Sequence, residues 1–127
     1  VDIQSSILWT PDGGFIDNCQ AGDKPTSSGY NIVSDASCEF SAVGDSEITD
    51  AQLASLANNG GFTDTFLPAV TSPAVDLVPV SDCISATIDV LEYDQRGAFR
   101  PDGAFCDAGA VELNLDVIFR ADFEYTE

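Results

Sequence analysis

This chain has no histidine, and only four of its 127 residues are Lys or Arg. Without histidine, a Ser–His–Asp or Cys–His catalytic arrangement cannot be built, and a zinc site loses its usual nitrogen ligand. The 22 Asp and Glu residues give a formal net charge of −18, which argues against nucleic acid as a partner because phosphate binding depends on basic residues. No apolar run approaches the roughly 18 residues that span a bilayer, so we expect no membrane insertion.

The chain does contain four cysteines, which is an even number. Together with the absence of histidine, this number favours two disulfide bonds in an oxidising compartment over a metal site. We therefore expect an extracellular or cell-surface protein. The four cysteines allow three pairings, which this count alone leaves open. The chain enters a strand pattern directly at Val1 without a signal peptide, which indicates a mature form or a fragment.

The first 44 residues alternate short apolar segments with turns. From Val1 to Trp9 the apolar residues fall mainly on one face, a pattern typical of a half-buried strand or of one rung of a β-helix. Turn signals at 11–14 and a Gly/Ser/Pro-rich loop at 21–29 interrupt the chain before another rung at 30–35. Short strands broken by turns at a spacing of about 20 residues are typical of stacked coils.

The segment 45–61 changes character and predicts a short helix. Thr49 or Asp50 can cap a helix over 51–57, whose apolar residues fall on one face at helical spacing. The NNGG sequence that follows can end the helix in a left-handed conformation. We expect this helix to cap the core.

Strict alternation returns at the C-terminus. From Val111 to Tyr125 every second residue is apolar, without a slip in the pattern. As a single strand this segment would span roughly 50 Å, which is long against a usual strand of about 3–10 residues. We expect the strand to be bent, shared between two sheets, or paired with another polypeptide.

Charged residues of both signs are concentrated between residues 93 and 112. This stretch holds two of the four basic residues, Arg96 and Arg100, among several carboxylates and turn-forming glycines. Guanidinium–carboxylate pairs can hold irregular backbone in one shape, and we expect at least one such pair to be buried. We call this expected structure the clasp, and its residues are Asp76, Asp94, Arg96, Arg100, Asp107 and Glu112.

Three ordered runs carry a family resemblance: SSGYNIVSDASC (27–38), LASLANNGGFTDTFLPAVTSPAVD (53–76) and DQRGAFRPDGAFCDAGAVE (94–112). The chain resembles the C-terminal region of bacterial choice-of-anchor Q domain proteins, which are surface proteins with a pectate-lyase-like fold. It departs from them in a longer spacer between Cys83 and the DQRG motif.

The resemblance implies an all-β fold, namely the end coils of a right-handed parallel β-helix with a short capping helix and a long C-terminal strand. We expect one domain over 1–127. Its parts are β-helix rungs (1–44), the capping helix and turn (45–61), the terminal coil and clasp (62–112) and the C-terminal strand (113–127). Sequence order and the resemblance together favour the disulfides Cys19–Cys38 and Cys83–Cys106.

We expect a secreted or cell-surface β-helix module with a structural or adhesive role. Its partners would be upstream β-helix coils or further copies of the chain, joined through strand edges into an oligomer or a filament. We expect no enzymatic activity and name no catalytic residue, although the many carboxylates do not exclude glycoside hydrolysis. Two alternatives stay open: the non-catalytic end of a carbohydrate-active β-helix protein, and a calcium-dependent glycan-binding module that contacts cell-surface glycans.

Ligand candidates follow from those alternatives. Calcium takes oxygen ligands, which two acidic clusters offer, although a solvated acidic surface is the competing interpretation. The clusters are Asp12, Asp17 and Asn18, and Asp45, Glu47 and Asp50. For glycan binding we single out Trp9, which sits at a strand end beside a turn and could stack on a sugar ring.

Overall fold

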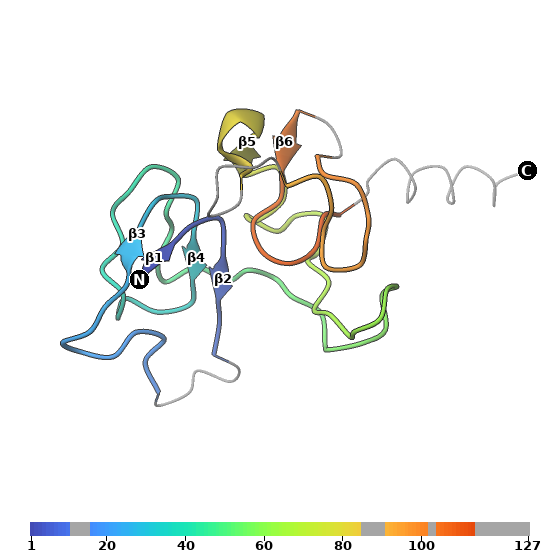
Figure 1. The fold of residues 1–127 in the computed structure, drawn as a ribbon. Helices are drawn as coiled ribbons and strands as arrows, with labels where there is room; N and C mark the ends of the chain where they lie inside the picture. Colours follow the sequence, from blue (N-terminus) through green and yellow to red (C-terminus); the bar gives the residue numbers. More distant parts are fainter. Residues whose placement is uncertain (11–15, 85–90, 102–103, 114–127) are drawn as a thin grey trace, which may run out of the picture.

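The computed structural model describes residues 1–10, 16–84, 91–101 and 104–113 (Figure 1). Its regular elements are short: β1 (Asp2–Ile3), β2 (Ile7–Leu8), β3 (Thr26–Ser27), β4 (Ile32–Val33), β5 (Val78–Pro79), the 3-10 helix η2 (Val80–Asp82) and β6 (Phe105–Cys106). Within these ranges η2 is the only helical element, so the expected all-β class is confirmed. The C-terminal strand predicted over 113–127 lies, beyond its first residue, outside the described residues.

Segments from the first part of the chain lie side by side in parallel. β1 pairs with β3, with Asp2 opposite Thr26, and β2 pairs with β4, with Ile7 opposite Ile32. Ile32 also forms a parallel bridge with Ser46 on a third segment. Each parallel neighbour requires the chain to travel back before it pairs again. The four N-terminal strands gather at one side of the molecule, away from β5 and β6 (Figure 1).

The first segment is two short strands rather than one continuous strand. Ser5 adopts a left-handed conformation with φ of 50°, which interrupts the alternation between β1 and β2. At this break the Ser5 N–H donates to the Gly29 carbonyl over 3.0 Å, and the Ser5 carbonyl accepts from the Gly109 N–H over 2.8 Å. The break therefore lets one residue bond both to the segment that follows β3 and to the C-terminal part of the chain.

The predicted helix over 51–57 is wrong. This segment is extended and pairs in antiparallel fashion with 65–68, through bridges between Leu53 and Pro68 and between Ala57 and Thr65. The N–H groups of Ala57 and Thr65 donate to each other's carbonyl over 3.1 and 2.9 Å, respectively. Because the backbone amides find these partners across the turn, they are not available for helical bonds. The NNGG sequence forms the turn between the two segments instead of ending a helix.

β4 lies between two apolar clusters. Its two residues alternate, so Ile32 belongs to a larger cluster while Val33 packs with the Cys19–Cys38 disulfide, Leu8 and Phe40. The larger cluster draws its members from both ends of the described chain: Tyr30, Ile32, Ala51, Ala74, Val78, Cys83, Cys106 and Ala108. The parallel N-terminal segments and the C-terminal part therefore share one core.

β5 and β6 form an antiparallel pair with Val78 opposite Cys106. Pro79 lies in β5, which is an edge strand in this two-stranded sheet, as expected for a residue without an N–H donor. The second disulfide, Cys83–Cys106, joins β6 to the residue that follows η2. This corner of the fold positions the residues of the clasp.

Candidate functional site: the clasp and the neighbouring cavities

Asp94 is the centre of one half of the clasp. Its side chain is 0% exposed, and each carboxylate oxygen accepts two hydrogen bonds. Oδ1 accepts from the backbone N–H groups of Arg96 and Ala98 over 2.8 and 3.0 Å. Oδ2 accepts from Arg96 Nε over 3.0 Å and from the Glu112 N–H over 2.9 Å. The carboxylate thus closes its own turn and holds a segment 18 residues further along the chain.

Arg96 extends this half of the clasp to a third segment. Besides its ion pair with Asp94, its Nη2 donates to the Glu112 carbonyl over 2.7 Å and its Nη1 to the Asn59 carbonyl over 3.2 Å. Asn59 belongs to the turn that joins the extended segments 51–57 and 65–68. One guanidinium therefore fastens that turn to the C-terminal part of the chain.

Arg100 forms the other half of the clasp. Its Nη1 and Nη2 donate to the carbonyls of Asp107 and Gly109 over 2.9 and 2.8 Å, and Nη1 lies 3.5 Å from Glu112 Oε2. The same Glu112 oxygen accepts from the Asp107 N–H over 2.9 Å. The side chains of Arg100 and Glu112 are 7% and 1% exposed. This ion pair is therefore buried, and backbone carbonyls bind both Arg100 Nη atoms, whereas Arg100 Nε is buried without a hydrogen-bond partner.

The remaining two clasp acids act without an arginine partner among the ion pairs that the described residues form. Asp107 accepts from the backbone N–H groups of Asp76 and Leu113 over 2.8 and 2.6 Å. Asp76 contributes this amide rather than its carboxylate, and it adopts a left-handed φ of 54°. The structure thus brings all six predicted clasp residues into one connected network, but only Asp94 and Glu112 pair directly with arginines.

Burial and hydrogen bonding shift the pKa values of two clasp acids in opposite directions. Burial tends to raise the pKa of Asp94, but hydrogen bonds from the Glu112 and Ala98 amides and from Arg96 outweigh it, so this pKa lies below its usual value. Burial raises the pKa of Asp107 above its usual value despite hydrogen bonds from Asp76 and Leu113. Pairs of carboxylic acids whose pKa values are shifted in opposite directions also occur at catalytic sites. In this site, however, both carboxylates are engaged by backbone amides, which indicates a structural role.

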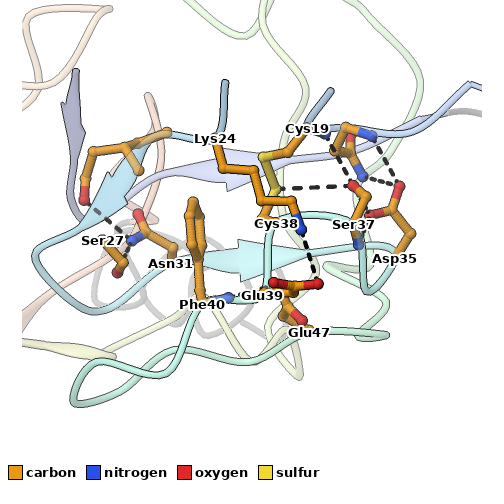
Figure 2. The surroundings of a disulfide bond; sticks show 12 residues. Cys19, Lys24, Ser27, Asn31, Asp35, Ser37, Cys38, Glu39, Phe40 and Glu47 are labelled. Atoms are coloured by element: carbon orange, nitrogen blue, oxygen red, sulfur yellow. Dashed lines mark hydrogen bonds and ion pairs between the residues drawn. A yellow bond between two sulfur atoms is a disulfide. The ribbon is translucent and has the colours of Figure 1, made fainter. Parts of the chain in front are cut away.

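The structure contains both expected disulfides, Cys19–Cys38 and Cys83–Cys106, and no free cysteine. Figure 2 shows a polar network beside the first disulfide. Ser37 Oγ accepts from the Cys19 N–H over 2.9 Å and donates to Asp35 Oδ1 over 2.6 Å. Burial tends to raise the pKa of Asp35, but bonds from Ser37 and Asn18 lower it below its usual value. The disulfide therefore sits in a turn that its polar neighbours also define.

The calcium candidates occupy separate structural roles. Asn18 donates to Asp35 rather than joining Asp17, which is exposed, while Asp12 lies outside the described residues. Asp45, Glu47 and Asp50 accept hydrogen bonds from different turn amides, at Asn31 and Ala42, at Phe40 and at Gln52. Among the residues that the structure describes, no group of three or more acidic, histidine or cysteine side chains could hold a metal ion. The carboxylates of Asp45, Glu47 and Asp50 accept hydrogen bonds from backbone amides instead.

Asn31 is a buried polar centre that is not among the site residues expected from the sequence. It is 0% exposed, and its Nδ2 donates to Ser27 Oγ over 2.9 Å and to Asp45 Oδ1 over 3.1 Å (Figure 2 labels Asn31 and Ser27). Its Oδ1 accepts from the Ser6 N–H over 3.0 Å. Asn31 thus ties together three parallel segments. The available signal was an amide between Tyr30 and two β-branched residues, in a run otherwise suited to a buried strand.

Trp9 lies directly after β2 and is 37% exposed. Its ring meets that of Phe66 edge to face, with ring centres 5.9 Å apart and planes at 63°. Both rings line a groove of about 390 Å³ together with Leu53, Pro68 and Val111. The groove is mostly apolar, and Asp64 and Gln95 are among the polar residues that border it.

A second cavity of about 410 Å³ shares the lining residues Ile7, Gly109 and Ala110 with this groove. It extends to Arg100 of the clasp and to the Cys83–Cys106 disulfide.

No helix in the described ranges has the length and apolar character needed to cross a membrane. Comparisons of the chain with protein-family models, curated proteins and solved structures found no significant match.

Proposed function

We propose that this chain forms the C-terminal end of a right-handed parallel β-helix in a secreted or cell-surface protein, with a structural or adhesive role. The observation that carries the proposal is the parallel arrangement of successive segments, in which β1 lies beside β3 and β2 beside β4, with Ser46 following on β4. The resemblance of three sequence runs to choice-of-anchor Q proteins supports it. The two disulfides support an oxidising, extracellular setting.

The clasp suits the end of such a stack. Coils within a stack satisfy their backbone groups by pairing with the next coil, whereas the last coil needs other partners. Arg96 and Arg100 supply four donors to backbone carbonyls, and the carboxylates of Asp94 and Asp107 accept from five backbone amides. These side chains take the place of a further coil.

Among the described residues, no strand pairs with the other edge of β1 or β2, and the Gly109 N–H donates to the Ser5 carbonyl between these two strands. The carbonyls of Val1 and Ile3 accept from Thr26 and Ser28, so the backbone groups of Asp2 between them face away from β3. The carbonyls of Ser6 and Leu8 accept from Ile32 and Ser34, which turns the backbone groups of Ile7 outward in the same way. This edge takes another coil, from upstream polypeptide or from another copy of the chain.

The test is sedimentation velocity and electron microscopy of the full chain over a range of concentrations, beside a version truncated after Glu112. We expect association through a strand edge, and a head-to-tail contact that does not close would give filaments. The variant Asp2→Pro removes one outward-facing amide N–H and should weaken association through β1. Truncation after Glu112 should have the same effect on association in this variant as in the wild type. Stable, well-folded monomers of both versions at high concentration would contradict the proposal that an edge needs a partner.

A further inference from the structure

Asn59 is the one asparagine of this chain that a glycine follows. An asparagine in this position can lose its side-chain amide spontaneously, because glycine has no Cβ to shield its backbone nitrogen from the neighbouring carboxamide. Asn59 and Gly60 lie in the turn between the extended segments 51–57 and 65–68, and Gly60 is exposed. The turn therefore carries the residue pair of a deamidation site at the surface of the molecule.

Deamidation at such a pair has two steps. A base in the solvent removes the proton of the Gly60 amide, and the nitrogen bonds to Asn59 Cγ while the Cγ–Nδ2 bond breaks and ammonia leaves. Water then opens the resulting succinimide at either carbonyl carbon, which gives aspartate or isoaspartate. The chain thus gains a water, loses an ammonia and acquires a further negative charge.

The folded turn opposes this reaction through hydrogen bonds to both reacting groups. The Gly60 N–H donates to Asn58 Oδ1 over 3.0 Å. Asn59 Nδ2 donates to the carbonyl and hydroxyl oxygens of Thr65 over 2.9 and 3.0 Å, and to the Ala57 carbonyl over 3.3 Å. The reaction removes the proton from the first donor and expels the second as ammonia, so it must break every one of these bonds. We therefore expect it to proceed while the turn is open.

Contacts with two residues of the clasp region keep the turn closed. Arg96 Nη1 donates to the Asn59 carbonyl over 3.2 Å, and Gln95 Nε2 donates to Thr63 Oγ1 over 2.6 Å. Gly61 packs so tightly against Arg96 that an added Cβ would lie 2.8 Å from the Arg96 Cα. We propose that Asn59 is a deamidation site whose reaction rate is set by release of the turn from Arg96 and Gln95.

Deamidation also opposes closing of the turn afterwards. A carboxylate has no donor, so in the aspartate product an oxygen takes the place of Nδ2 and faces the carbonyl oxygens of Thr65 and Ala57. In the isoaspartate product the main chain is longer by a carbon directly before Gly60, and Gly61 has no free space beside Arg96 to accommodate a shift. Either product therefore loosens the contact between the turn and the clasp.

This modification goes beyond the structural role proposed above and does not depend on it. A chain that stacks with other coils can keep Asn59 intact, and a chain that remains a monomer can deamidate. The extent of deamidation and the sedimentation of the chain therefore test separate proposals.

The test is incubation of the full chain in mildly alkaline buffer, with peptide mapping by mass spectrometry at intervals. We expect aspartate and isoaspartate to accumulate at Asn59, more than about tenfold more slowly than in the chain unfolded in urea, because the bonds of the turn must open first. Asn58 is the internal control, since it is exposed in the same turn but precedes another asparagine. In the unfolded chain it should react more slowly than Asn59.

Three variants connect the rate to the clasp. Thr63→Ala removes the bond from Gln95 and leaves the clasp ion pairs intact, so it should speed deamidation about two- to tenfold, the loss of one hydrogen bond. Arg96→Lys lacks the planar fork of donors and should speed it further. Lys24→Ala is the matched control, because it breaks an exposed ion pair outside the turn and should deamidate at the wild-type rate.

A fourth variant tests the consequence of the reaction. Asn59→Asp reproduces one product and should melt at a lower temperature than the wild type. The proposal is overturned if no product forms at Asn59, if Asn59 reacts equally fast in the folded and unfolded chains, if Thr63→Ala and Arg96→Lys react no faster than Lys24→Ala, or if Asn59→Asp melts as the wild type does. Thr63→Ala keeps the proposal testable if Arg96→Lys fails to fold.

Discussion

At the scale of single residues, side chains pair with backbone N–H and C=O groups that neighbouring long strands would pair in other β proteins. The carboxylates of Asp94 and Asp45 each accept from two or more backbone amides, and Asn31 bridges three parallel segments. The guanidiniums of Arg96 and Arg100 in turn donate to backbone carbonyls. Since buried backbone groups must be paired, a fold with such short strands depends on these side chains.

Removal of one clasp arginine should therefore be costly. We expect Arg96→Ala and Arg100→Ala each to lower the free energy of unfolding by about 3–5 kcal/mol, because each leaves a buried carboxylate without its charge partner. Chemical denaturation measures this change. The matched control is Lys24→Ala, which breaks the exposed ion pair with Glu39 and should cost less than about 1 kcal/mol. Similar losses of unfolding free energy in all three variants would show that the clasp ion pairs stabilise the protein no more than an exposed ion pair does.

The lowered pKa of Asp94 predicts a loss of stability in acid. Its folded-state pKa lies below the value of about 3.9 for an unfolded aspartate, so its contribution is complete above that value and disappears as the pH falls through the folded-state pKa. Asp107 acts in the opposite sense, because its raised pKa favours folding of the protonated form. We expect Asp94→Asn to be less stable than the wild type at neutral pH and to lose less stability below pH about 4. Parallel pH profiles for the two proteins would contradict this assignment.

At the scale of elements, the turn between the extended segments 51–57 and 65–68 is the contact surface for the clasp. Asn59 in this turn receives Arg96 Nη1, and its own Nδ2 donates to the Thr65 carbonyl over 2.9 Å. Gly61 lies so close to Arg96 that an added Cβ would meet the Arg96 Cα at 2.8 Å. The turn therefore needs glycine for close approach as well as for its left-handed backbone.

Adjacent glycines in this turn provide a matched pair of variants. Gly60 and Gly61 both have positive φ, but an added Cβ at Gly60 would meet nothing within 4 Å. We expect Gly60→Ala to cost about 1–2 kcal/mol from backbone strain alone. Gly61→Ala should cost more, because the backbone of Arg96 must also move. Thermal unfolding of both variants measures the difference, and equal losses would mean that the turn does not pack against Arg96 as described.

At the scale of the whole molecule, the two parts of the described chain are held together by one core and by a few polar links. The larger apolar cluster contains Tyr30 and Ile32 from the parallel segments and Cys106 and Ala108 from the C-terminal part. The Tyr30 hydroxyl donates to Asp82 Oδ2 over 2.9 Å, and this bond together with burial raises the pKa of Tyr30. These contacts must hold against the mutual repulsion of a chain with a net charge of −18.

This repulsion predicts that salt stabilises the protein. Exposed like charges repel less as the screening length falls from about 30 Å at 0.01 M salt to about 8 Å at 0.15 M. We therefore expect the melting temperature to rise as sodium chloride is added over this range at neutral pH. The clasp ion pairs should not reverse the trend, because buried pairs are screened far less than surface charges. A melting temperature that falls with added salt would show that attractive surface pairs outweigh the repulsion.

Several features of the protein follow from its sequence alone. The all-β class follows from short apolar segments separated by turn residues, and the two disulfides follow from four cysteines without histidine, although their pairing needed sequence order and the family resemblance as well. The clasp could be located because two of only four basic residues fall among acids within one short stretch. Composition and local pattern are sufficient for such features, since each depends on the residue types present and not on distant partners.

The tertiary structure decided what depends on distant partners. The segment 51–57 has helical spacing but is extended, because Thr65 and Leu67 offer its amides bonds across the turn. Only the folded chain places Ser6 and Asp45 around Asn31, or leaves Arg100 Nε and Ser5 Oγ buried without hydrogen-bond partners. Hydrogen-bond partners that are far apart in sequence leave no periodic signal, so their assignment belongs to the three-dimensional fold.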